Sequence, residues 1–137
     1  DVGNNVGSKY SFRMDTAVLP ALINAGFDVL SFANNHVGDW NITAFKDTLK
    51  RLSESSLPAT GAGLNKTQAQ TPVIIEKNGI KFGFLGFSDV GPQWMVAKEN
   101  SAGILLANDP RFSEIISNAK KQVDVLIDES DILQVQY

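Results

Sequence analysis

The feature that most constrains the fold is a pair of apolar segments separated by Asn78-Gly79. Val73–Lys77 and Ile80–Phe87 are rich in the β-branched and aromatic residues that favour strands. Asn-Gly accepts the positive φ angles of a type I′ turn, which joins two antiparallel strands through two residues. The sequence therefore predicts a β-hairpin, and with it an antiparallel pair of strands.

The segment before the hairpin predicts a loop, a helix and a strand. Residues 1–13 are rich in Gly, Asn and Ser and have no apolar period, so a loop is expected there. An amphipathic helix is predicted from a cap at Asp15 or Thr16 to about Asn24, with Gly26 as its C-terminal stop. The apolar run 27–33 follows and is typical of a strand covered on both faces.

Further helix and strand patterns complete the fold prediction. A helix capped by Thr43 runs to about Glu54, and another begins at the pair Asp109-Pro110. Ala59–Gly63 indicates a short strand, Lys66–Gln70 one helical turn, and Val123–Ile127 a second buried strand. Helix-strand units on both sides of a hairpin indicate an α/β fold, with a mixed sheet, flanking helices and a single domain.

Composition excludes several classes of function. A chain of 137 residues that is 43% hydrophobic can bury a core of its own. Its net charge of -3 gives no basic surface for nucleic acid, and the absence of cysteine excludes disulfides and thiolate metal sites. No apolar run approaches the roughly 18 residues of a membrane span.

The strongest site chemistry is Asn34-Asn35-His36, at the end of the predicted strand 27–33. In α/β sheets, ligands bind beyond the carboxyl ends of strands. An amide oxygen can ligate a divalent cation, and an imidazole can ligate it or protonate a leaving group, so the tripeptide suits metal-assisted hydrolysis. The alternative is that the two asparagines shape a turn and His36 is an ordinary histidine.

The neighbours of this tripeptide favour the first interpretation. In order and spacing, the chain resembles the CapA family of bacterial capsule-biosynthesis proteins, which are linked to poly-γ-glutamate and have a fold similar to calcineurin-like metallophosphoesterases. The resemblance runs from about Phe12-Arg13 to Ile127. It rests on Ala25–His36, Asp39, Gly61-Ala62-Gly63-Leu64-Asn65, Ala69, Pro72 and Asn78–Gly86.

The resemblance implies a part of an α/β/β/α sandwich and a set of site residues. Asn35 and His36 would be ligands of divalent metal ions, and His36 would also be the acid or the stabiliser of the transition state. Asp39 would orient His36, or else cap a turn. Asn34 would contact the substrate, and Arg13 would bind a carboxylate or phosphate of it, unless it is only a solvated surface residue.

The same resemblance implies that this chain is a fragment. The family has a strand ending in Gly-Asp, an Asn-Leu-Glu segment and a His-Trp-Gly segment; none of them occurs here, and His36 is the only histidine. We therefore expect a hydrolase or phosphoesterase-like domain of a cell-surface, extracytoplasmic protein, inactive alone. Its partners would be poly-γ-glutamate or another anionic polymer and the capsule machinery, with membrane association only through missing segments. The alternative is a non-catalytic polymer-binding or assembly module.

Other polar and aromatic residues are weaker candidates. Ser88-Asp89 ends the second hairpin strand and either faces the site or forms a turn. Trp40 and Trp94 either stack on a ligand or pack on the core. The acidic residues Asp128, Glu129 and Asp131 either bind a hard cation or form a solvated terminus, and the tail 128–137 is divergent. Asn41 replaces a family glycine and is expected to keep its turn, since Asn tolerates positive φ.

Overall fold

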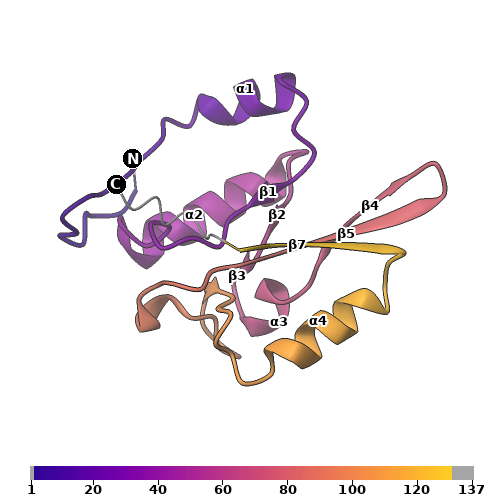
Figure 1. Ribbon diagram of the computed structural model, residues 1–137. Coiled ribbons are helices and arrows are strands. Elements are labelled where there is room, and N and C mark those ends of the chain that lie inside the picture. The colour runs from indigo at the N-terminus through magenta and orange to yellow at the C-terminus, as the bar shows by residue number, and fades with distance from the viewer. Residues whose placement is uncertain (1, 131–137) are drawn as a thin grey trace, which may run out of the picture.

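The computed structural model describes residues 2–130, and its helices and strands alternate along the chain (Figure 1). In chain order they are α1 (Val18–Asn24), β1 (Leu30–Ser31), α2 (Asn41–Glu54), β2 (Ala59–Thr60), β3 (Ala62–Gly63), α3 (Lys66–Ala69), β4 (Val73–Lys77), β5 (Ile80–Phe87), the 3-10 helix η1 (Gln93–Met95), β6 (Gly103–Ile104), α4 (Phe112–Lys120) and β7 (Val125–Ser130).

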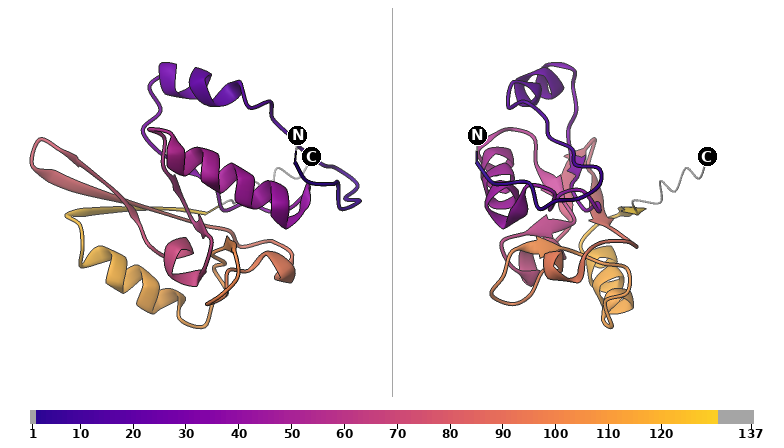
Figure 2. Two further views of the ribbon diagram at one scale, coloured as in Figure 1. Left: turned by 180° about the vertical axis from the view of Figure 1, so that it is seen from behind. Right: turned by 90° about the vertical axis from the view of Figure 1, so that its left-hand side faces the viewer.

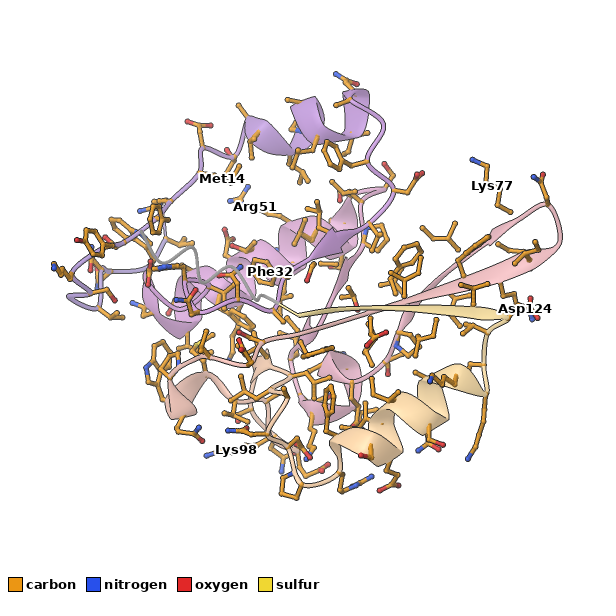
Figure 3. All side chains as sticks on the ribbon, viewed as in Figure 1. Met14, Phe32, Arg51, Lys77, Lys98 and Asp124 are labelled. Atoms are coloured by element: carbon orange, nitrogen blue, oxygen red, sulfur yellow. The ribbon has the colours of Figure 1, made fainter. Side chains whose placement is uncertain are left out.

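The predicted hairpin forms the largest sheet. β4 and β5 are antiparallel, and β7 pairs with β5 in parallel, so the three-stranded sheet is mixed and has the order β4-β5-β7. Asn78 and Gly79 have φ angles of 55° and 78°, as a type I′ turn requires. Asp124 holds the start of β7 beside the hairpin (Figure 3), since its Oδ2 accepts a hydrogen bond from Lys81 N at 2.8 Å. The α/β fold with a mixed sheet is confirmed.

Helix α4 covers one face of this sheet only. Ile115 and Ala119 of α4 pack with Leu85 of β5 and with Leu105 in a buried cluster. The opposite face carries the alternate residues of β7, and Val125 and Ile127 are 41% and 43% exposed there. The prediction of a strand in this segment is confirmed, but the prediction that it is buried is wrong, because the described residues leave its other face largely exposed.

A second cluster lies between α2, η1, β3 and β6 and holds the segment that follows β1. Phe45 of α2, Met95 of η1 and Ile104 of β6 are each at most 1% exposed, and Ala33 packs with them. Phe32 stacks on Phe45 with the ring centroids 5.5 Å apart (Figure 3). The residues just before Asn34 are therefore fixed by core packing.

The predicted strand 27–33 is much shorter in the structure. Only Leu30 and Ser31 form β1, which pairs in parallel with β2, and Phe27 is 52% exposed. The expectation of a strand covered on both faces is wrong: the pairing with β2 ends after two residues, so most of the segment is not in a sheet. Likewise Ala59–Gly63 divides into two strands at Gly61, which has a φ angle of 83°.

Helices α1 and α2 begin at residues other than the predicted caps. Asp15 accepts a hydrogen bond from Ala17 N, and α1 starts at Val18. It contributes no buried residue and lies at the outer side of the molecule, beyond α2 (Figure 2). Helix α2 starts at Asn41, whose side chain accepts from Thr43 N, so Thr43 lies inside the helix. Asn41 has a φ angle of 66°, which confirms the expected turn.

Helix α4 also starts later than predicted, and its entry is fixed by an ion pair. Asp109 Oδ2 lies 2.6 Å from Lys66 Nζ of α3, and Asp109 Oδ1 accepts from Arg111 N. Burial acts to raise the pKa of Asp109, but the hydrogen bonds from Lys66 and Arg111 and their charges outweigh it. The pKa of Asp109 consequently lies below its ordinary value.

This pair predicts a pH-dependent loss of stability in Asp109→Asn. A carboxyl group whose pKa is lowered by folding stabilises the protein above its unfolded pKa of about 3.9, and the effect is lost as the pH falls through the folded value. We expect the variant to lose about 1–2 kcal/mol of unfolding free energy at neutral pH and almost none near pH 2. Urea unfolding at both pH values measures this, with the exposed Asp28→Asn as control. An equal loss at both pH values would contradict it.

Candidate functional site

The candidate site is the turn between β1 and α2, which carries Asn34-Asn35-His36. Asn34 Oδ1 accepts a hydrogen bond from His36 N at 2.8 Å, and His36 O accepts one from Asp39 N at 3.0 Å. These bonds make the segment a compact turn that ends where α2 begins. Ala33 before it and Asp39 within it are buried, whereas Asn35 is exposed. The turn thus has a fixed base and an accessible tip.

His36 and Asp39 form a hydrogen-bonded pair. His36 Nδ1 lies 2.9 Å from Asp39 Oδ2, and the Asp39 side chain is 6% exposed while that of His36 is 38% exposed. Because a carboxylate can only accept, the hydrogen of this bond is on Nδ1, and the neutral ring carries its lone pair on Nε2. The predicted orientation of His36 by Asp39 is present in the structure. Nε2 is the atom left to bind a cation or to exchange a proton.

The N-terminal loop, residues 2–13, lies against this pair and completes the surroundings of Asp39. Asp39 Oδ2 also accepts from Phe12 N at 3.0 Å, its Oδ1 from Ser8 Oγ at 3.5 Å, and its backbone oxygen from Val6 N at 2.9 Å. The loop was predicted, but its contacts with Asp39 were not. These contacts join residues 27 to 33 positions apart in the chain, and patterns of neighbouring residues cannot predict contacts over such a separation.

Phe12 makes a further contact that sequence reasoning missed. Its ring meets the His36 imidazole edge-on, with centroids 4.6 Å apart and an interplanar angle of 82°. Phe12 is nevertheless 63% exposed. In the sequence, Phe12-Arg13 stands out only because the pair resembles a position of the family. Nothing in the sequence indicated that Phe12 touches the histidine.

Arg13, the next residue of this loop, lies against Trp40, which follows Asp39 in the chain. Its guanidinium carbon is 4.5 Å from the centroid of the Trp40 ring, and Nη2 donates to Val2 O at 3.2 Å. A guanidinium stacked on an aromatic face is held in place and keeps its charge. The structure therefore places Arg13 against Trp40, the residue that follows Asp39, while Asp39 itself is bonded to His36. Trp40 packs in this arrangement and Trp94 is 50% exposed, with its ring against Gly38 of the turn.

Within the described residues, the donors of the turn do not amount to a complete metal site. There, no group of three or more His, Cys, Asp or Glu side chains could hold an ion. Asn35 and His36 Nε2 are the two donors that the turn offers, and a carboxylate bound to Nδ1 is the usual partner of a metal-binding histidine. The chemistry of the two donors fits a divalent cation, but the cation would need more ligands than these.

Ser88 and Asp128, two of the weaker candidates, have places elsewhere in the fold. Ser88 is fully buried and its Oγ donates to Val90 O, so it has a structural role in the turn after β5. Asp128 belongs to β7, and Asp131, with the rest of the tail 131–137, lies outside the described residues.

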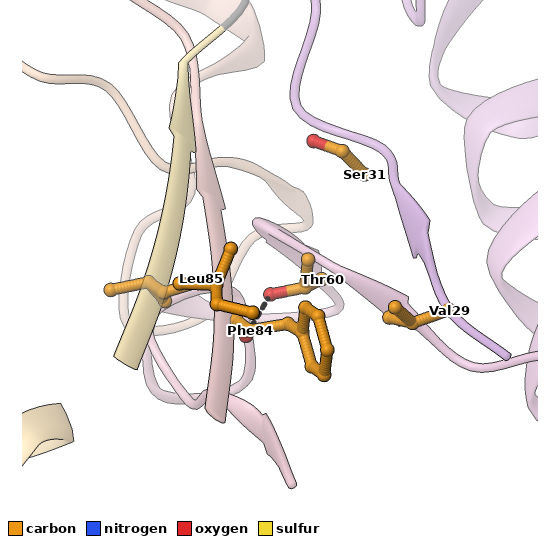
Figure 4. Close-up of a pocket in the computed structure, with 6 residues that line it drawn as sticks. Val29, Ser31, Thr60, Phe84 and Leu85 are labelled. Atoms are coloured by element: carbon orange, nitrogen blue, oxygen red, sulfur yellow. Dashed lines mark hydrogen bonds between the residues drawn. The ribbon is translucent and has the colours of Figure 1, made fainter. Parts of the chain in front are cut away.

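A small cavity lies away from the turn, where β1 and β2 approach β5 and β7 (Figure 4). Its volume is about 170 Å³, and its lining is Val29, Ser31, Thr60, Phe84, Leu85 and Ile127. Thr60 Oγ1 donates to Phe84 O and accepts from Gly86 N, which links β2 to β5 and uses its hydrogen-bonding capacity. Because no titratable group lines it, the cavity has no acid-base chemistry to offer.

Comparison with known proteins assigns the class to which this fold and turn belong. Residues 1–129 match the family described as bacterial capsule synthesis protein PGA_cap. The chain belongs to this family. It is 36% identical over 110 residues to the PGA biosynthesis protein CapA of Bacillus subtilis, and 36% identical over 100 residues to the capsule biosynthesis protein CapA of Bacillus anthracis.

These matches cover most of this chain and a minor part of the relatives. They include 80% and 73% of this chain, but 29% and 24% of the respective relatives. The chain thus spans less than a third of the length of the curated relatives that it matches.

Among residues 2–130, no helix has the length and apolar character needed to cross a membrane.

The geometry predicts that Asp39→Asn destabilises the fold. The carboxylate accepts from His36 Nδ1 and Phe12 N at Oδ2 and from Ser8 Oγ at Oδ1. Asparagine has one uncharged acceptor oxygen in place of these two, so the bonds at Oδ2 lose their charge assistance and the Ser8 hydroxyl loses its acceptor. We expect a loss of about 1–3 kcal/mol of unfolding free energy, measured by urea denaturation. The exposed Asp89→Asn carries the same charge change and should lose almost nothing. Equal losses in the two variants would show that Asp39 is not an anchor of this loop.

Proposed function

We propose that this chain is the part of a capsule-polymer biosynthesis protein that supplies an acid-base histidine to a hydrolase or transferase site. The observation that carries the proposal is the His36–Asp39 pair, in which Nδ1 is held by a buried carboxylate and Nε2 is left for chemistry. A histidine oriented in this way can take a proton from a nucleophile or give one to a leaving group. The roles named for the two relatives are PGA biosynthesis and capsule biosynthesis.

A divalent cation is the proposed cofactor of this site. Asn35 offers an amide oxygen at the exposed tip of the turn, one residue before the imidazole. Bound there, the cation would polarise a carbonyl or phosphoryl oxygen of the substrate. Asn34 has its amide oxygen engaged by His36 N, so its amide nitrogen is the group that can donate to a substrate. Arg13 would bind the anionic group of that substrate, proposed to be poly-γ-glutamate or a related polymer of the cell envelope.

The cofactor proposal predicts that metal affinity depends on the turn. Titration calorimetry with Mn²⁺ and Zn²⁺ should show affinity falling about tenfold or more in Asn35→Ala and in His36→Ala, because each removes one of few ligands. Asn100→Ala, an exposed asparagine of a distant turn, is the matched control. Unchanged affinity in both site variants would remove Asn35 and His36 as metal ligands.

A second function, binding of an anionic polymer without catalysis, is favoured by Arg13. Its charge is fixed against Trp40 beside the turn, and Lys9 of the same loop lies 5.1 Å from the Tyr10 ring centroid. Lys9 and Arg13 thus present two positive charges from one loop, each in contact with an aromatic ring. Such charges can bind a polymer that carries repeated carboxylates.

This second function predicts polymer binding that does not need metal. With excess chelator, poly-γ-glutamate should bind the protein, weaken with added salt, and bind about fivefold or more weakly to Arg13→Ala. Arg51→Ala is the control, since Arg51 is also a half-exposed arginine but lies on α2, paired with Asp47. Fluorescence anisotropy with labelled polymer measures the difference. Absence of binding with and without metal would exclude this role.

A further inference from the structure

Phe12 has two separate contacts with the His36–Asp39 pair. Its backbone N–H donates to Asp39 Oδ2 at 3.0 Å, and this is the same oxygen that His36 Nδ1 contacts at 2.9 Å. Its ring meets the imidazole edge-on at 4.6 Å. Phe12 is 63% exposed, so it gains little from burial, and its ring nevertheless contacts the site histidine.

The two contacts restrain different motions of the imidazole. A hydrogen bond from Nδ1 fixes one corner of the ring but leaves it free to pivot about that bond. A half-turn about the Cβ–Cγ bond would also break the bond and place a carbon where Nδ1 was. The Phe12 ring stands edge-on to the imidazole and obstructs both movements. Because the Phe12 N–H is bonded to Asp39, the base of this obstructing side chain is itself held in place.

We propose that Phe12 is a positioning residue for His36: its ring holds the imidazole in the orientation and tautomer in which Nδ1–H donates to Asp39 and Nε2 is open to a ligand. The importance of this for a reaction rests on the proposed function, since orientation matters only where His36 acts. The orientation itself is a property of the protein without any ligand.

Two neighbours of Phe12 provide matched controls. Tyr10 and Met14 lie two residues to either side and are 64% and 67% exposed, close to the 63% of Phe12. The contacts of the described residues include a ring contact with His36 for Phe12 alone among these three. Removing any of the three side chains thus removes a similar exposed apolar group, but only one of them should affect the histidine.

The test is nitrogen-15 NMR of the imidazole in the full chain, near pH 8, where one histidine gives one unambiguous set of signals. In the unaltered protein we expect the Nδ1–H tautomer to dominate. In Phe12→Ala the ratio of the Nδ1–H to the Nε2–H tautomer should fall roughly threefold to tenfold, the range that an edge-to-face aromatic pair supplies. Tyr10→Ala and Met14→Ala should leave the ratio unchanged.

Phe12→Leu keeps an apolar side chain but lacks the aromatic edge, and its ratio should also fall. This variant decides the question if Phe12→Ala does not fold, as judged by circular dichroism. An unchanged ratio in the folded Phe12 variants would overturn the proposal. Since the measurement needs neither metal nor polymer, its failure is distinct from a failure of the proposed function, which the titrations above test.

Discussion

The buried carboxylate of Asp39 is the interaction on which the site depends. It is 4% exposed and accepts hydrogen bonds from a side chain of its own turn and from the backbone of a loop far away in the chain. A charge so far removed from water is stable only where donors surround it. The position of the N-terminal loop and the orientation of His36 are therefore not independent: the same oxygen fixes both.

Local patterns in the sequence were sufficient for the elements that depend on local interactions. The Asn78-Gly79 hairpin, the helix predicted from Thr43 to about Glu54 and the helical turn predicted over Lys66–Gln70 depend on turn geometry and apolar period, and all three are present. The Asn65 cap of the short helix was not predicted. The observed start of α2 differs from the start predicted from a cap at Thr43. Asn41 is the first residue of α2 and its side chain accepts from Thr43 N, because Asn can adopt positive φ and still accept from the backbone.

Predictions failed where they depended on what covers a surface. An apolar run such as 27–33 or 123–127 is typical of a strand buried on both faces, yet burial is decided by the partners that the strand meets. In β7, Leu126 faces α4 and packs in a cluster, whereas Val125 and Ile127 on the other face are largely open. The prediction of the site was limited in the same way, because contacts between residues far apart in the chain could not be predicted. His36 and Asp39 are three positions apart and their contact was expected, but Ser8 and Phe12 meet Asp39 across 31 and 27 positions.

The arrangement of Phe12 and Arg13 joins the two proposed functions physically. Consecutive residues of one loop place an aromatic ring on the imidazole and a guanidinium on Trp40, and the first of them is bonded to Asp39. An anionic group bound by Arg13 would therefore act on the same loop segment that holds the histidine. Capture of a polymer and orientation of an acid-base group would then share one structural element. If both proposals hold, a polymer-binding role is not an alternative to chemistry at His36, since one loop would bind the charge and would also set the geometry of the ring.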